Sequence, residues 1–266
     1  MEKCILVPFD FSNEADFALD HAYEFARTLN IPIHLIHIVN SEKEIDEWQI
    51  ELNKVAKRFS LEHNNSKIVA AVRAGSLFDT IYDYGVEANT YLAVMGTHGI
   101  KTIDKAVKVI KQFSKIPFVL VQRPISFGQF NKICVPIDEN KKSREKFLWV
   151  RHLEYLFKSK VYVTYPESTD PVKKEEINKN LIFATTIFEE YAIDFDVFPI
   201  SEQNVFDNLY DYMYDLEPDV VLFMTDKYKK IVTNLKKPQN IELAKKIPVM
   251  CVNPRTDIVK IGGFSH

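Results

Sequence analysis

Two closely spaced glycines are the residues whose position best suits the binding of a charged ligand. Gly96 and Gly99 follow the apolar run at residues 91–95 and precede a lysine-rich segment. A glycine lacks a Cβ, so the backbone can turn sharply and a ligand can approach it closely. A helix that begins just beyond would offer free N–H groups to an anion. A plain strand-to-helix turn has the same pattern, because short glycine motifs also occur by chance.

The elements around these glycines are predicted to alternate between strands and helices. Short apolar runs, typical of strands buried on both faces, cover residues 4–9, 31–39, 67–72, 91–95 and 117–121. Segments with helical spacing lie between them, at residues 13–26, 42–62, 76–87 and 102–115. This β-α alternation is typical of an α/β fold with a doubly wound, Rossmann-like parallel sheet.

The same pattern then returns. The sequence Ile-Cys-Val-Pro-Ile-Asp at residues 133–138 repeats the spacing of Ile5–Asp10. Strands are predicted at residues 132–138, 160–164, 193–198, 218–224 and 246–252, with helices at 143–157, 172–191 and 204–215. A recurrence of about 130 residues indicates two copies of one domain. We therefore expect domains at residues 1–124 and 130–254, joined by a linker at residues 124–130.

These motifs resemble those of the universal stress protein family in its tandem form. The resemblance rests on residues 5–12, 37–39, 74–75 and 94–99, which read ILVPFDFS, HIV, AG and VMGTHG. It implies a five-stranded parallel sheet of order 3-2-1-4-5 in each copy. The ends of the first and fourth strands would then face each other at the topological switch point, where the strand order reverses.

The resemblance also implies a nucleotide site in the first copy. In nucleotide-binding members, the aspartate lies near the ribose and adenine, the glycine loop holds phosphate, and backbone after the second strand contacts the base. The candidate positions in this sequence are Pro8, Asp10, Ile38, Gly96, Thr97, His98 and Gly99.

The phosphate-binding part of this motif is incomplete. The family pattern resembles G-x-x-G, nine residues, then glycine and serine or threonine. Counted from Gly99, the last two positions hold Val109 and Ile110; aligned back from Pro117, they fall near Asp104 and Lys105. The second pair of phosphate contacts is missing in either alignment. Asp104 would repel a phosphate, whereas the adjacent lysines at 101 and 105 would partly offset that repulsion as point charges.

The second copy has lost more of the motif. Its equivalent of Met95–Gly99 is taken to be Met224–Tyr228, and no glycine occurs between Gly128 and Gly262. A glycine-rich phosphate cradle is therefore excluded there. Asp138 remains, and we interpret it as a cap at the end of its strand.

Other groupings have simpler explanations. The lysines of residues 101–115 occupy one side of a helix, which predicts a solvated face or, alternatively, a contact with an anionic partner. His34 and His37 would point to opposite faces of a strand, so we expect no shared metal ion and assign no metal site. Asp10, Ser12 and His98 could be written as a hydrolytic triad, but the chain has no G-x-S-x-G motif.

Composition sets the broad class. The 266 residues are 46% hydrophobic and 27% charged, which suits a globular protein with a large core. The net charge of −3 gives no reason to expect nucleic-acid binding. The apolar runs are too short for a membrane span, the chain starts almost directly with a strand, and its three cysteines have no C-x-x-C spacing. We therefore expect a cytoplasmic protein that contacts neither membranes nor nucleic acids.

We expect a non-enzymatic stress-response binding module without assigned catalytic residues. The alternatives are an ATP-binding protein with slow hydrolase or nucleotidyl-transfer activity, and a scaffold without a small-molecule ligand. No cofactor is assigned beyond the two candidates ATP and AMP, with weak or no ATP affinity in the first copy and none in the second. The copies would form an intramolecular pseudo-dimer whose fifth strands lie together, and a further homodimer is left open.

Overall fold

The computed structural model describes residues 2–97, 116–125, 130–224 and 247–252 of the chain. The lysine-rich helix predicted at residues 102–115, together with His98 and Gly99, lies outside the described residues. Among the described residues, no helix has the length and apolar character that crossing a membrane requires.

The two halves of the chain build the same series of elements. The first half contains strands β1 (Cys4–Pro8), β2 (Ile33–Val39), β3 (Ile68–Ala74), β4 (Thr90–Gly96) and β5 (Phe118–Val121), with helices α1 (Asn13–Leu29), α2 (Ile45–Glu62) and α3 (Leu77–Glu87). The second half contains strands β6 (Lys132–Pro136), β7 (Lys160–Glu167), β8 (Phe195–Ser201), β9 (Val220–Met224) and β10 (Val249–Val252), with helices α5 (Glu145–Phe157), α6 (Pro171–Glu190) and α7 (Val205–Leu216). Short 3-10 turns, η1 (Glu42–Glu44) and η2 (Lys141–Arg144), precede α2 and α5.

The ten strands of the described residues form one continuous sheet. Their order is β3-β2-β1-β4-β5-β10-β9-β6-β7-β8. Counted from each outer edge to the centre, both halves show the order 3-2-1-4-5 that the family resemblance implied. Neighbouring strands within each half run parallel, so the predicted doubly wound fold is confirmed.

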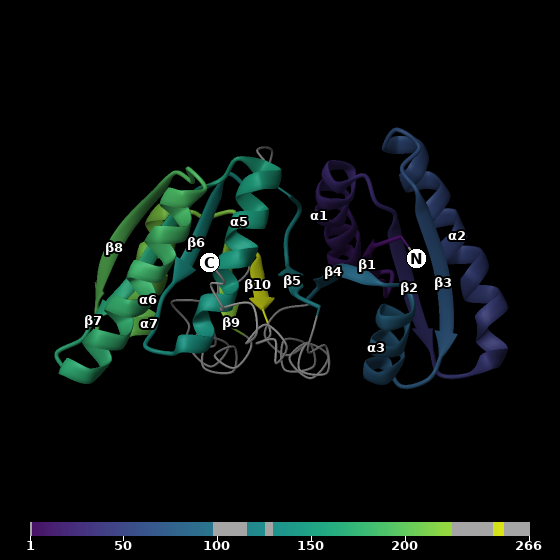
Figure 1. Cartoon of the computed structure of the whole chain (residues 1–266). Helices are drawn as coiled ribbons and strands as arrows, with labels where there is room; N and C mark the ends of the chain where they lie inside the picture. The colour runs from purple at the N-terminus through teal and green to yellow at the C-terminus, as the bar shows by residue number, and fades with distance from the viewer. Residues whose placement is uncertain (1, 98–115, 126–129, 225–246, 253–266) are drawn as a thin grey trace, which may run out of the picture.

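Among the described strands, an antiparallel pair joins the two halves of the sheet. Val249 lies opposite Leu120, and Cys251 lies opposite Phe118. This confirms the prediction that the two fifth strands lie together, and it shows that they hydrogen-bond as neighbours in one sheet. Figure 1 shows β5 and β10 at the centre of the molecule, between the two sets of helices.

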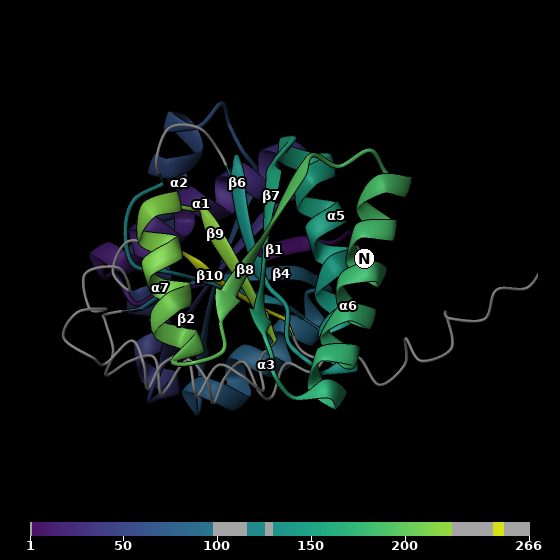
Figure 2. The ribbon, with the colours of Figure 1, turned by 90° about the vertical axis from the view of Figure 1, so that its left-hand side faces the viewer.

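Helices cover both faces of the sheet (Figure 2). On one face, residues of α1, α2, α5 and α6 share a single apolar core that continues across the junction. On the other face, α3 and α7 each pack over a smaller separate core. The four residues of β5 are all buried, as expected for a strand that has neighbours on both edges and helices on both faces.

Phe130, at the end of the predicted linker, is part of the continuous core. Its ring lies 4.8 Å from that of Phe25 in α1 and 5.0 Å from that of Phe157 in α5, measured between ring centroids. Only 2% of Phe130 is exposed. The linker therefore ends in a buried aromatic anchor that packs against helices from both halves.

Next to this anchor lies a buried histidine. His21 of α1 contacts the backbone carbonyl oxygen of Arg123 through Nε2 at 3.2 Å, and its ring lies 5.9 Å from that of Phe130. Burial lowers the pKa of the imidazole from 6.5 to about 4. His21 is therefore neutral in the folded protein at neutral pH. Because a carbonyl oxygen can only accept, the imidazole proton lies on Nε2.

The low pKa predicts a specific acid sensitivity. Between pH 6.5 and about pH 4, the unfolded chain binds a proton at His21 that the folded chain does not, so the stability falls as the pH falls through this range. From pH 7 to pH 5, we expect wild type to lose about 2 kcal/mol more unfolding free energy than His21→Phe. Urea denaturation of both proteins at the two pH values measures this difference. An equal loss in the two proteins would contradict the assignment of His21.

Candidate functional site at the strand ends

Four of the candidate nucleotide residues, Pro8, Asp10, Gly96 and Thr97, lie at or just beyond the ends of β1 and β4. These strands are neighbours, with Leu6 opposite Ala93, while β2 lies on the other side of β1. The order therefore reverses between β1 and β4, as at the ligand crevices of open α/β sheets. Pro8 ends β1 and Gly96 ends β4, so the carboxyl ends of these two neighbouring strands lie side by side.

Asp10 lies two residues beyond the end of β1 and is exposed. Its Oδ1 accepts hydrogen bonds from the backbone N–H and the hydroxyl of Ser12. The Ser12 hydroxyl oxygen in turn accepts from the N–H of Ala15 at 3.2 Å, which caps α1. Asp10 thus orders the start of α1 while its carboxylate faces solvent.

Between Asp10 and Ser12, Phe11 has a left-handed backbone, with φ at 63°. Such a conformation is unfavourable for a bulky residue and needs compensation from its surroundings. The Phe11 ring packs 4.9 Å from His37 and 5.0 Å from Trp48. His37 also contacts the carbonyl oxygen of Phe9 through Nδ1 at 2.7 Å. This aromatic cluster, Phe9, Phe11, His37 and Trp48, fixes the path of the chain around Asp10; the sequence analysis did not identify it.

The structure gives Gly96 a different role from the one inferred from its sequence position. A Cβ added at Gly96 would lie 2.2 Å from the carbonyl oxygen of Glu14 and 2.8 Å from the backbone nitrogen of Ala15. The first turn of α1 therefore occupies the space that the missing Cβ leaves. On this side of Gly96 the close approach is made by a helix, so the glycine has a packing role; ligand binding at Gly96 stays a prediction.

Three other candidates occupy defined positions. Thr97 is 1% exposed and donates its backbone N–H to the carbonyl oxygen of Val121 at 2.9 Å, so it extends the β4–β5 ladder. Pro8 and Ile38 are half-buried, and Ile38 packs against the core beneath α3. Thr97 thus serves the sheet, whereas Pro8 and Ile38 line the α3 side of the strand ends.

The charges around the start of α1 are negative. Glu14 and Asp16 lie in its first turn, next to Asp10. Burial raises the pKa of the Asp16 carboxyl, although nearby Arg58 opposes this shift. Favourable interaction of the helix dipole with an anion is offset by these carboxylates. Among the described residues at this helix start, the arrangement suits a ligand that donates hydrogen bonds better than one that brings phosphate charge.

The two histidines of β2 lie on opposite faces, as expected from their spacing. His34 contacts the Tyr84 hydroxyl of α3 through Nδ1 at 3.0 Å, and burial lowers the pKa of its imidazole. His37 belongs to the aromatic cluster on the other face. Within the described ranges, no group of three or more potential ligands is placed to hold a metal ion.

Strand register also corrects the alignment of the two halves. Leu92 lies opposite Ile5 in the first half, and Val220 lies opposite Ile133 in the second. Because Ile5 and Ile133 are equivalent, Met224 stands at the position of Gly96, one place away from the equivalence with Met95 taken from the sequence. The sequence alignment had matched Met95 with Met224 because both are methionines. The strand pairing instead makes Leu92 equivalent to Val220.

Asp138 behaves as the cap that the sequence suggested. Its Oδ1 accepts hydrogen bonds from the Asn140 backbone N–H at 3.0 Å and from the Ser143 hydroxyl. It holds the turn that follows β6, much as Asp10 holds the turn after β1. The equivalence of the two strand ends is therefore preserved in their local hydrogen bonding.

Comparison with known proteins finds a family model that matches the first part of the chain. Residues 1–109 match the model of the universal stress protein family. The resemblance to the universal stress protein family is confirmed. No curated protein matches the chain.

Solved structures extend the likeness to the whole fold. A universal stress protein from Archaeoglobus fulgidus DSM 4304 aligns with a TM-score of 0.71 at 13% identity, covering 96% of this chain and 97% of its own. A protein from Pseudomonas aeruginosa PAO1, described as functionally unknown, aligns with a TM-score of 0.66 at 13% identity, covering 95% and 93%. At this identity the likeness shows the fold alone: a universal stress protein fold that spans both halves.

The packing at Gly96 predicts a loss of stability from a single methyl group. In Gly96→Ala the new Cβ would clash with backbone atoms of α1, which cannot rotate away as a side chain can. We expect the unfolding free energy to fall by about 2 to 4 kcal/mol, by the same amount with and without added AMP. Urea denaturation followed by circular dichroism measures it. An unchanged stability of the free protein would show that α1 does not need this glycine.

Proposed function

We propose that the protein is a stress-response binding module whose first domain, residues 1–124, binds an adenine nucleotide weakly through its nucleoside part. The observation that supports this most directly is the strand register, which brings Pro8, Asp10 and Gly96 to one topological switch point. The second domain, residues 130–254, has no part in this nucleotide site. The three cysteines are buried and free, in keeping with the cytoplasmic location expected from the sequence.

Asp10 is the residue proposed to hold the ribose. A carboxylate offers about four acceptor positions, and ribose hydroxyls are donors that it can accept from. Its hydrogen bonds to Ser12 fix the orientation of the carboxylate before a ligand arrives. The half-buried side chains of Pro8 and Ile38 supply an apolar surface next to it, which suits the flat face of a base.

The phosphates receive less support. Glu14 and Asp16 add negative charge at the start of α1, and the described contacts of Gly96 and Thr97 go to α1 and β5. The sequence lacks the second pair of phosphate contacts as well. AMP and ATP should therefore bind about equally, because the nucleoside supplies most of the affinity. The described residues do not include His98, Gly99 or the lysines that follow them. Any contribution of these residues to phosphate binding is measured by the titration below.

Titration calorimetry with AMP and with ATP tests this preference. We expect dissociation constants that agree within about threefold, and an affinity for AMP that falls about tenfold in Asp10→Ala. Asp138→Ala is the matched control, because it removes the equivalent carboxylate from the other half and should leave AMP binding unchanged. A clear preference for ATP would mean that residues 98–115 provide phosphate contacts that the sequence did not reveal.

The two alternatives give different results. A slow hydrolase or nucleotidyl transferase would release product from ATP and Mg²⁺, and Asp10→Ala would abolish the release. A scaffold without a small-molecule ligand would show no calorimetric heat with AMP or adenosine. We expect binding without turnover, measured as less than one product released per protein molecule over hours.

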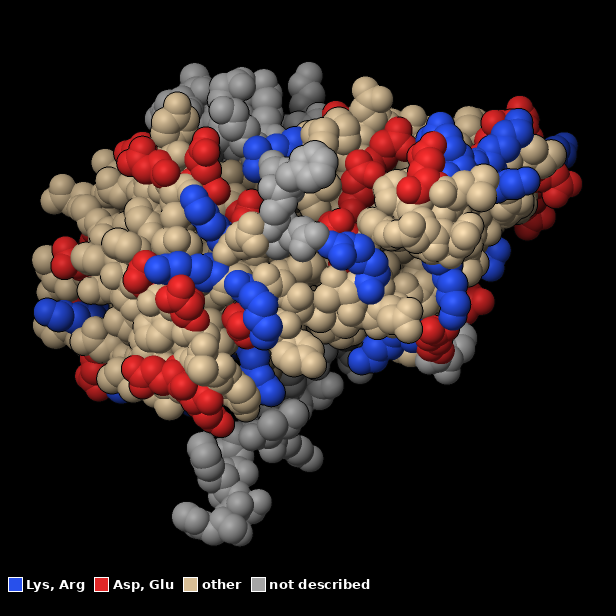
Figure 3. All heavy atoms as spheres, turned by 90° about the horizontal axis from the view of Figure 1, so that it is seen from above, with Lys and Arg blue, Asp and Glu red and all other residues tan. Residues whose placement is uncertain are grey.

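The face of the molecule seen in Figure 3 mixes acidic and basic side chains over both halves, with neither sign dominating it. A nucleic-acid surface would show basic side chains gathered on one face. This view therefore offers no support for a nucleic-acid partner and agrees with the proposal of a small ligand.

A further inference from the structure

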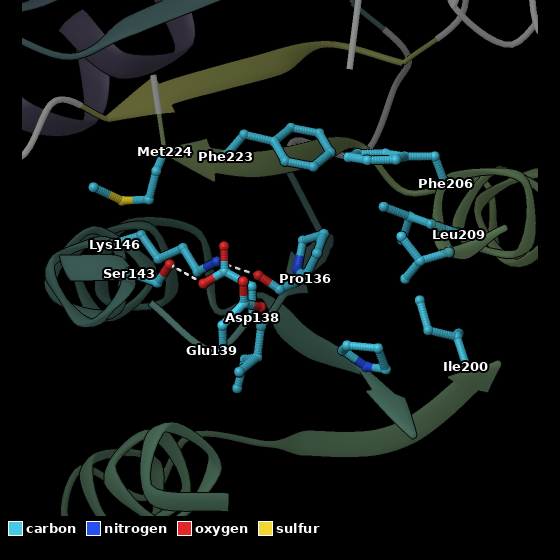
Figure 4. Close-up of a pocket in the computed structure, with 13 residues that line it drawn as sticks. Pro136, Asp138, Glu139, Ser143, Lys146, Ile200, Phe206, Leu209, Phe223 and Met224 are labelled. Carbon is cyan, nitrogen blue, oxygen red and sulfur yellow. Dashed lines mark hydrogen bonds between the residues drawn. The ribbon is translucent and has the colours of Figure 1, made fainter. Parts of the chain in front are cut away.

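We propose that the second half carries a separate binding site for a small uncharged aromatic molecule. The site is a cavity of about 190 Å³ at the carboxyl ends of β6, β7 and β9, closed on one side by α7. It shares no residue with the nucleotide site proposed above, and it contains none of the glycines that a phosphate cradle needs. Figure 4 shows the side chains that line it.

The cavity exists because the helix start differs from that of the first half. At the position of Gly96 the second half has Met224, which lines the cavity. Backbone could not approach Met224 as closely as α1 approaches Gly96. The chain after β6 accordingly forms the 3-10 turn η2. When the two halves are aligned, α5 begins at Glu145, four residues later than the start of α1.

A buried asparagine holds this altered turn in place. Asn180 of α6 is fully buried and donates hydrogen bonds to the carbonyl oxygens of Asp138 at 2.8 Å and Asn140 at 3.1 Å. Its side-chain oxygen accepts from Nε of Arg144 at 2.8 Å. These bonds tie the turn to α6, so the cavity wall is ordered without a ligand.

Most of the cavity wall is apolar and partly aromatic. Phe223 of β9 and Phe206 of α7 lie along one wall, with Leu209 below Phe206 and Ile200 below Leu209 (Figure 4). An apolar cavity of about 150 Å³ is large enough for benzene. The cavity in this protein therefore fits a molecule of one or two aromatic rings.

The other end of the cavity is polar and carries charges of both signs. Lys146 is 3% exposed and donates to the carbonyl oxygen of Pro136, while Asp138 and Glu139 bring two carboxylates. The equivalent position in the first half holds the small apolar Ala18, so the lysine is particular to this half. Two carboxylates beside one ammonium disfavour an added anion, and an uncharged ligand with one polar N–H or hydroxyl group fits best.

Indole is a suitable probe because it is uncharged and has two fused rings and one N–H group. The protein is labelled with ¹³C at the methionine methyl groups, and the Met224 signal is assigned with Met224→Leu. We expect indole to shift the Met224 methyl resonance saturably, with a dissociation constant of about 1 mM or tighter. AMP should neither shift this resonance nor displace indole.

Two leucine-to-tryptophan variants, one inside the cavity and one on the surface, provide a matched comparison of indole binding. Leu209→Trp fills the cavity and should weaken indole binding at least about tenfold, whereas Leu148→Trp, on the exposed surface of α5, should leave it unchanged. If Leu209→Trp does not fold, Val205→Trp, at a half-buried position on the same wall, takes its place. A Met224 shift that does not saturate, equal binding by the filled variant, or displacement by AMP would each overturn the proposal.

Discussion

The antiparallel pairing of β5 with β10 is the contact on which the rest of the structure depends. Without it, each half would end in an exposed, wholly apolar strand edge, which is prone to aggregation. With it, Phe118–Val121 and Val249–Val252 become the centre of a ten-stranded sheet. Burial of such side chains contributes about 2 kcal/mol each, and the core on the α1 and α5 face continues across the pair. The two topological switch points are thereby fixed relative to each other within one chain.

The two halves show how one residue on a strand can change what lies at the strand ends. Gly96 allows the first turn of α1 to pack directly on β4, and Asp10 and Ser12 cap that turn. The side chain of Met224 prevents a helix from packing as closely on β9. A 3-10 turn, held by hydrogen bonds from Asn180, replaces the helix start. At the first switch point the exposed Asp10 lies beside an acidic helix start, whereas the second includes an apolar cavity. Divergence of two sites within one fold requires no change in sheet topology.

Much of the fold could be predicted from sequence because it follows from periodic patterns. The alternation of apolar runs and helical segments gave the strand and helix order, and the repeat at residues 133–138 indicated two copies. The order 3-2-1-4-5 and the central position of the fifth strands came from the family resemblance. Strand ends were less accurate: β7 continues through Pro166 to Glu167, although a proline ordinarily ends a strand.

The site was predicted less completely because its properties depend on tertiary packing. The position of Asp10 follows from the strand order, but the use of Gly96 by α1 is a contact between segments about 80 residues apart in the chain. The left-handed backbone of Phe11 also leaves no sequence signal, since phenylalanine rarely adopts it. One site residue, Lys146, could have been found from the sequence. Aligning the two copies places it at the position of Ala18 and so shows a charge at a core position.

Hydrogen exchange of the intact protein tests the central role of the strand junction most directly. Mass spectrometry would follow peptides that cover residues 118–121 and 249–252 under native conditions. If the junction unites the halves, both peptides should be among the slowest to exchange, at the same rate, through one cooperative unfolding event. Fast exchange of β10 beside a protected β5, or separate unfolding of the two halves, would contradict a structure organised around this pair.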